Sequence, residues 1–271
     1  MKRILNALIL GVASLIGVVS FLYPFYQPQA QSAGGAMSHG NDALFIFGLL
    51  ILFCLGAVLS NLESRRFNSK MVAALGVLTA INAVLRVISI PAGASATFFL
   101  PVLVGYVYGP TFGFLLGTLS LLVSALIGGW IGPWVPYQMF AFGWVGLTSG
   151  WLPDLRRWRR AEVILLTAWG LAWGFAFGAI MNLWFWPYVF SPGDEGLYWQ
   201  PGIGLVETLK RYAAFYALTS LWWDLVRAVG NGMLLLLFAA PIVKLLRRFQ
   251  QRFHFETDQR HFTDAGSHAP S

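Results

Sequence analysis

Long apolar stretches alternate with short polar connections along most of the chain. A helix that crosses about 30 Å of hydrocarbon needs roughly 20 apolar residues. The fourth stretch is too short to cross perpendicularly and runs into a Gly-Pro pair, so we expect a broken helix packed among the others. The pattern predicts about eight membrane-spanning helices: Ile4 to Tyr23, Ala43 to Leu59, Met71 to Ile90, Phe98 to Tyr108, Thr111 to Ile127, Val135 to Leu152, Val163 to Trp186 and Leu218 to Val243.

Composition agrees with this pattern and narrows the class of protein. The chain has 271 residues, of which 57% are hydrophobic and 11% charged, whereas a soluble domain carries about 25% charge. The prediction is therefore an all-α, polytopic membrane helix bundle. The only cysteine, Cys54, leaves no partner for a disulfide and no thiol cluster for a metal.

Candidate catalytic groups are scarce. The histidines lie in connections or in the tail, so no span supplies a general base or a metal ligand. The sequence contains no G-x-x-x-x-G-K-[ST] motif that could cradle ATP phosphates. We expect a protein that is not an enzyme and has no cofactor of its own; ATP, if used, is hydrolysed by partner subunits. The histidines are His39, His254, His261 and His268.

Basic residues indicate the orientation, because Lys and Arg concentrate in cytoplasmic loops. Their clusters all fall on one side of the predicted bundle, which predicts a multi-pass plasma-membrane protein with both termini in the cytoplasm. The net charge of +7 is then explained by topology and anionic lipids, without a nucleic-acid partner. Alternatively, the first span is a cleaved signal peptide. The clusters are Lys2 and Arg3; Arg65, Arg66 and Lys70; the segment PDLRRWRR; and Lys244, Arg247, Arg248 and Arg252.

Small residues recur at helical spacing in several spans. Such stripes let helix backbones approach closely, and ordinary bundle packing is the first interpretation of the glycines. A further stripe, Ala73, Gly76, Ala80 and Ala83, follows the third span and fits either the bundle interior or the docking of another membrane subunit. The glycine stripes are Gly170, Gly174 and Gly178; Gly109, Gly113 and Gly117; and Gly146 and Gly150.

Polar residues inside the spans gather at one depth. Counted at 1.5 Å per residue from the nearest cytoplasmic basic residue, the outer ones lie about 24 to 33 Å up, and two asparagines lie about 18 to 20 Å up, near the midplane. The sequence therefore predicts a polar layer in the outer half of the bundle. The outer residues are Arg86, Gln138, Asn182, Asp224 and Arg227, and the deeper ones are Asn82 and Asn231.

Two interpretations of this layer remain open. An intramembrane arginine is costly and usually faces protein or a water-filled cavity. Asp224 and Arg227 are three residues apart and can pair, which fits a structural network. The other interpretation is a ligand pocket open to the outside, walled by aromatic side chains such as Trp134 and Trp223, although tryptophans also gather at membrane interfaces. The excess of one positive charge hints at an anionic group on the ligand.

Short motifs in the last six predicted spans suggest a family. The segments GPTFGF, GPWVPYQM and WDLVRAVGN, taken in this order, resemble the substrate-binding membrane component, or S component, of energy-coupling factor (ECF) vitamin transporters. The resemblance covers approximately residues 71–248. It leaves a two-helix extension over residues 1–70 without a role, and a polar tail over residues 249–271 that we expect to be disordered.

The resemblance implies a six-helix core that captures a vitamin or vitamin precursor from outside. The outward loops around Ala92, from Gly128 to Trp134 and from Pro187 to Tyr198 would close over the site. Its partners would be a transmembrane scaffold (T) subunit, docked on the Ala73–Ala83 stripe, and two ABC-type ATPases. The substrate-binding residues that we expect come from the polar layer and the aromatic side chains around it: Arg86, Trp134, Gln138, Asn182, Trp223, Asp224, Arg227 and Asn231.

Two other functions stay open at this point. A self-sufficient secondary transporter would need polar residues through both halves of the spans. A membrane assembly protein would need the glycine faces but no pocket. The vitamin itself is not indicated by the sequence.

Overall fold

All the regular elements that the structure describes are helices. The computed structural model describes residues 2–26, 40–63, 67–88, 96–128, 130–190, 193 and 195–266, and the expected all-α bundle is confirmed over them. The elements are α1 (Lys2–Leu22), η1 (Tyr23–Tyr26), α2 (Gly40–Glu63), α3 (Ser69–Val87), α4 (Phe99–Tyr108), α5 (Pro110–Gly128), α6 (Val135–Ser149), α7 (Arg159–Phe185), η5 (Trp186–Tyr188), η6 (Glu195–Leu197), α8 (Leu205–Thr219) and α9 (Leu221–Gly266).

Seven of the predicted spans each correspond to one helix, whereas the last, Leu218 to Val243, begins at the end of α8 and continues in α9. The helix α8 was not predicted. Six of the described helices (α1, α2, α3, α5, α7 and α9) are long and apolar enough to cross a membrane. The α4 helix has 10 residues and α6 has 15, fewer than the roughly 20 that a perpendicular crossing needs. The chain is therefore a multi-pass membrane protein in which two short helices are enclosed by longer ones.

The break that the sequence predicts after the fourth span is present. Gly109 has a φ of 94°, a conformation that glycine adopts without a steric cost. Pro110 then opens α5, where its missing N–H costs nothing. The first seven residues of α4 are all buried, so this helix packs among the others as expected.

Glycines bring two helix pairs into close contact. The most extensive contacts in the described bundle join α5 with α6 and α7 with α9. A side chain at Gly113 would collide with the backbone of Gly146. On α7, Gly174 lies against Ala228, and Gly178 makes room for the carboxylate of Asp224. These stripes therefore serve packing inside the bundle, as the first interpretation holds.

The N-terminal helices α1 and α2 pack on the core and on each other. Asn6 of α1 donates to the Thr111 hydroxyl at the start of α5 at 2.7 Å. Asn61 of α2 donates to Asn6 at 2.9 Å. Gly17 lies directly against the rings of Phe140 and Trp144 on α6. The extension is thus bound to the core by polar as well as apolar contacts.

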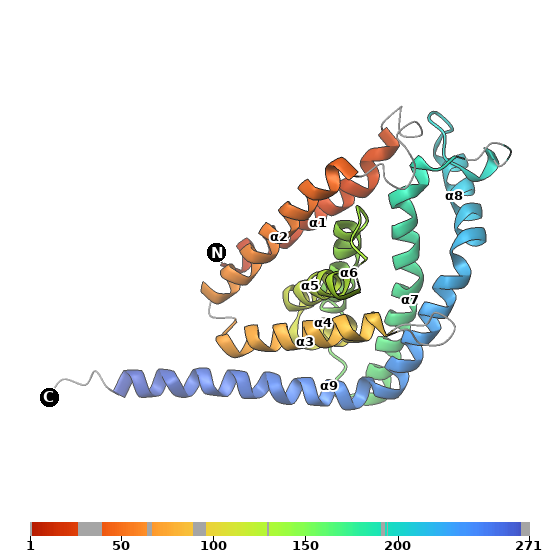
Figure 1. Cartoon of the computed structure of the whole chain (residues 1–271). Helices are drawn as coiled ribbons and strands as arrows, with labels where there is room; N and C mark the ends of the chain where they lie inside the picture. Colours follow the sequence, from red (N-terminus) through yellow and green to blue (C-terminus); the bar gives the residue numbers. More distant parts are fainter. Residues whose placement is uncertain are drawn as a thin grey trace.

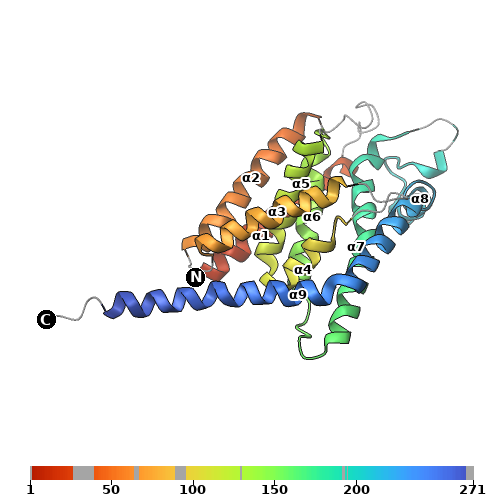
Figure 2. The same cartoon turned by 60° about the horizontal axis from the view of Figure 1, so that its bottom comes forward.

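The last helix, α9, changes direction after it has passed along α7 (Figure 1, Figure 2). Its first part runs beside α7, and its second part extends along the end of the bundle at which α7 begins (Figure 1, Figure 2). We call this end the basic end, because the loop before α7, the first turn of α7 and the second part of α9 together carry most of the arginines of the core. The opposite end, with α8 and the end of α7, is called the α8 end.

The part of the tail that the structure describes is helical, and residues 267–271 lie outside the described residues. Residues 249–266 continue α9 as a helix to Gly266, where low apolar content predicted disorder. The segment contains no Pro, and no Gly before Gly266, so nothing in it interrupts a helix that is already nucleated. Low apolar content argues against packing on a core, but it does not prevent local helix formation.

Candidate ligand-binding site

Arg86, near the end of α3, lies among neutral polar and aromatic groups. Its guanidinium donates to Ser124 Oγ of α5 at 3.0 Å and to Gln138 Oε1 of α6 at 3.3 Å. It also lies 5.8 Å from the ring centres of both Trp130 and Phe142. Within the described part of the chain, no carboxylate forms an ion pair with it.

Asp224 and Arg227 form the ion pair that their spacing predicts. Arg227 Nη1 donates to Asp224 Oδ1 at 2.7 Å. Asp224 is only 1% exposed and faces Gly178. The guanidinium of Arg227 also lies 5.2 Å from the ring centre of Phe177. This arginine is therefore neutralised within its own helix.

Three buried phenylalanine rings separate the two arginines. Phe98, Phe142 and Phe177 contact one another, with ring centres 5.2 to 5.4 Å apart. Arg86 lies over Phe142, and Arg227 over Phe177. The predicted single polar layer is thus two polar clusters on either side of an aromatic core.

The remaining predicted polar residues make hydrogen bonds within the bundle. Asn182 and Ser220 exchange hydrogen bonds at 2.8 and 3.0 Å, at the junction of α8 and α9. Asn231 is fully buried; it accepts from the backbone N–H of Phe98 at 2.9 Å and donates to the Arg227 carbonyl at 2.9 Å. It therefore caps the start of α4. Through these hydrogen bonds, both asparagines join separate segments of the bundle.

Asn82 belongs to the Arg86 side of the bundle. It is fully buried and donates to Ser120 Oγ at 2.8 Å. Its Oδ1 atom has no hydrogen-bond partner among the residues that the structure describes. An unsatisfied acceptor thus lies one helical turn below Arg86 on α3.

The predicted aromatic residues occupy different surroundings. Trp134 precedes α6 and packs edge-to-face on Trp184, with ring centres 6.3 Å apart. Trp223 is 60% exposed and so faces away from the bundle, as an interfacial tryptophan does. Trp130, from the loop that is expected to close over the site, has its ring centre 5.8 Å from the Arg86 guanidinium.

The small residues of the α3 stripe lie partly on the surface of the bundle and partly in its interior. Ala73, Gly76 and Ala80 are exposed, whereas Ala83 is fully buried. Gly76 has no heavy atom near the position of a Cβ. The exposed face also carries the apolar side chains Val77, Ile81 and Val84.

A charged cluster at the basic end was not predicted. Glu162, in the first turn of α7, is 4% exposed. It accepts from Arg247 of α9 at 2.5 Å and from the Tyr106 hydroxyl of α4 at 2.8 Å. Arg247 also contacts Asp154 at 3.5 Å, and a hydrogen bond from Arg156 holds the pKa of the Asp154 carboxyl below its usual value. Because these residues come from separate segments, sequence spacing carried no signal of the cluster.

Asp42 is a second charged residue with buried contacts that the sequence pattern did not indicate. At the start of α2, its carboxylate accepts from the hydroxyls of Tyr23 and of Tyr137, the latter at 2.9 Å. Tyr137 is fully buried in α6. This contact fixes the N-terminal extension to the core near the α8 end.

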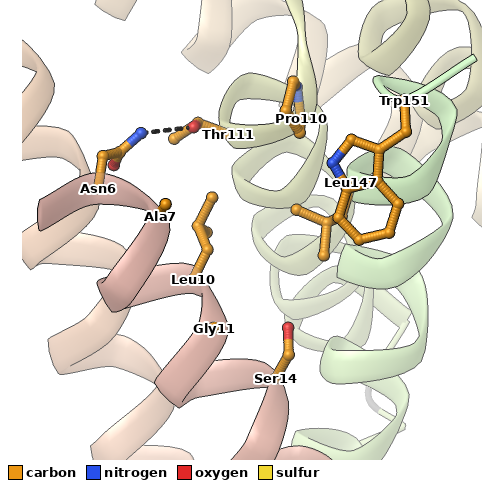
Figure 3. A pocket seen from close by; sticks show the side chains of 9 residues that line it. All are labelled: Asn6, Ala7, Leu10, Gly11, Ser14, Pro110, Thr111, Leu147 and Trp151. Atoms are coloured by element: carbon orange, nitrogen blue, oxygen red, sulfur yellow. Dashed lines mark hydrogen bonds between the residues drawn. The ribbon is translucent and has the colours of Figure 1, made fainter. Parts of the chain in front are cut away.

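Two cavities of the described structure lie away from the predicted polar residues. One of about 320 Å³ separates α1 from α5 and α6, and the hydrogen bond between Asn6 and Thr111 runs along its edge (Figure 3). Another, of about 630 Å³, lies at the α8 end and is lined by apolar and aromatic side chains such as Trp186 and Trp199. Neither includes a residue of the predicted site.

The fold and these buried groups define a helical membrane protein with two polar clusters inside its core. A family model described as "ECF transporter, substrate-specific component" matches residues 70–239. The chain therefore belongs to the family of ECF transporter substrate-specific components. The matched range covers most of residues 71–248, the part of the chain that carries the resemblance. Comparison with curated proteins gave no match, nor did comparison with solved structures.

Proposed function

We propose that this protein captures a vitamin or vitamin precursor from outside the cell and delivers it through a scaffold subunit driven by two ATPases. Membership of the substrate-specific component family supports the transport role. We further propose that the ligand carries an anionic group, which binds at Arg86. The single observation that carries this assignment is the uncompensated charge of Arg86.

The physical argument compares the two intramembrane arginines. Arg227 is paired with Asp224, so it has little need of a ligand. Among the described residues, the hydrogen-bond acceptors of Arg86 are the neutral groups of Ser124 and Gln138, and a buried charge without a counter-ion is unfavourable. A carboxylate or phosphate on the ligand supplies the missing charge and accepts charge-assisted hydrogen bonds.

The surroundings of Arg86 suit a ligand with a ring. Trp130 belongs to the loop between α5 and α6, which the family resemblance expects to close over the site. It is 52% exposed, so its ring is free to stack on a flat ligand. Gln138 and Ser124 add polar groups that orient the ligand. The proposed site therefore consists of Arg86, Ser124, Trp130 and Gln138.

Two variants separate ligand binding from folding. Arg86→Gln removes a charge that lacks a counter-ion, so we expect an unchanged or higher melting temperature and a loss of ligand affinity of at least about 30-fold. Arg227→Gln leaves Asp224 buried without its partner, so we expect a lower melting temperature, corresponding to about 3 kcal/mol or more.

The measurement uses purified protein in detergent. Mass spectrometry of the co-purifying small molecule identifies the ligand, and calorimetric titration then compares the variants. A neutral ligand, or unchanged affinity in Arg86→Gln, contradicts the assignment of Arg86. Neither result contradicts the transport role, which the uptake experiment below tests.

A self-sufficient secondary transporter is the second candidate function. The buried Glu162–Arg247 pair places charges at the basic end as well, and polar groups in both halves are what such a transporter needs. Uptake by this chain alone in liposomes, driven by an ion gradient, would favour it over the importer subunit. Uptake that depends on the ATPases and the scaffold would support the importer.

A further inference from the structure

A cavity of about 470 Å³ lies at the basic end, between the start of α7 and the second part of α9. Five of its lining residues are basic and one is acidic. Ala240 and Val243 add apolar surface. The basic residues are Arg156, Arg159, Lys244, Arg247 and Arg248, and the acidic residue is Glu162.

Two of these cations already have carboxylate partners. Arg247 is bound to the buried Glu162, and Arg156 to Asp154. Arg159, Lys244 and Arg248 are exposed and form no ion pair within the described residues. Three uncompensated positive charges therefore surround one cavity, a strong attraction for an anion.

The start of α7 adds to this attraction. Arg159 is the first residue of this 27-residue helix. The N–H groups of a first helical turn have no partners within the helix, and the helix dipole favours negative charge there. Glu162 in the same turn is occupied by Arg247, so its charge does not cancel the free cations.

The surroundings of the cavity indicate a lipid rather than a soluble anion. Trp158, Leu245 and Phe249, which neighbour the lining residues in sequence, are exposed, and such side chains favour the membrane interface. The second part of α9 extends along the same end of the bundle (Figure 1, Figure 2). Apolar and cationic side chains in one lining suit a headgroup phosphate next to acyl chains.

We propose that this cavity binds the phosphate of an anionic membrane lipid. The bound headgroup joins α7 to α9 at the basic end, next to the Glu162–Arg247 pair. The site is separate from the ligand site at Arg86 and does not depend on what that site binds.

The test is native mass spectrometry of delipidated protein titrated with phosphatidylglycerol, with phosphatidylcholine and with inorganic phosphate. The triple variant Arg159→Gln, Lys244→Gln, Arg248→Gln removes the three free cations but keeps Arg247, so Glu162 stays paired. The matched control, Arg157→Gln, Arg160→Gln, Arg252→Gln, removes equal charge from exposed residues outside the cavity lining. We expect the cavity variant to lose at least about tenfold in phosphatidylglycerol affinity and the control less than about threefold.

Several results would overturn the proposal. Equal losses in the two triple variants would mean diffuse attraction to the whole basic end. Equal affinity for phosphatidylcholine would mean that the charge is not recognised. If inorganic phosphate displaces phosphatidylglycerol at equal concentration, the ligand is a free anion. If the triple variant melts at a lower temperature, the double variant Lys244→Gln, Arg248→Gln is compared with Arg157→Gln, Arg160→Gln under the same criteria.

Discussion

Arg86 and Arg227 differ in their partners although both carry a guanidinium into the bundle. The pairing of Arg227 with Asp224 could be predicted, because residues three apart share a helix face. The partners of Arg86 could not, because Ser124 and Gln138 come from two other helices. Depth counting gives the height of a residue but not its direction around the helix axis. The sequence therefore indicated Arg86 and Gln138 of the proposed site but not Ser124, and the fold places the predicted polar residues in two clusters.

Gly178 of α7 allows a test of how closely this helix packs on the Asp224–Arg227 pair of α9. A Cβ at this position would collide with the Asp224 carboxylate, so Gly178→Ala should displace the ion pair and cost about 1 to 3 kcal/mol. Gly48→Ala on α2 is the matched control, because no heavy atom lies within 4 Å of the position that its Cβ would take. Thermal unfolding in detergent should show a lower melting temperature for the first variant only. Equal melting temperatures would mean that α7 and α9 separate easily at this point.

The helix α3 presents a small-residue face of the kind that membrane subunits use for close contact. Three residues of the predicted stripe are exposed, while Ala83 is buried, so its side chain is directed into the bundle. We predict that the double variant Gly76→Leu, Ala80→Leu abolishes co-purification with the scaffold subunit and leaves ligand affinity unchanged. Leu44→Ala and Leu52→Ala, which alter exposed positions on α2, serve as controls. Intact scaffold binding by the α3 variant would contradict docking on this face.

The N-terminal pair of helices had no role that the sequence could supply, since its hydropathy shows only that it is apolar. In the structure, Asn6 and Asp42 bind the hydroxyls of Thr111 and Tyr137 in the core. We predict that fragments 1–66 and 67–271, expressed together, co-purify, and that fragment 67–271 alone melts at a lower temperature. An unchanged melting temperature without the first fragment would mean that α1 and α2 are peripheral.

For the whole molecule, hydropathy predicted where the long apolar helices lie, because span length is set by the thickness of the membrane, but it did not predict the less apolar helix α8. It did not predict the helical continuation to Gly266 or the charged cluster around Glu162, since these depend on local propensity and on tertiary neighbours. The orientation in the membrane was inferred from basic loops alone. It is the property on which capture from outside depends.

Cysteine labelling tests this orientation, because Cys54 is the only cysteine and is buried. In a Cys54→Ala background, Trp130→Cys places a thiol in the loop beside Arg86, and Arg157→Cys places one at the basic end. We predict that a membrane-impermeant maleimide added to intact cells labels the first variant, and that the second reacts only after the membrane is opened. Both sites are exposed, so poor access of the reagent does not explain a difference. The reverse pattern would place Arg86 on the cytoplasmic side, and capture from outside would then be wrong.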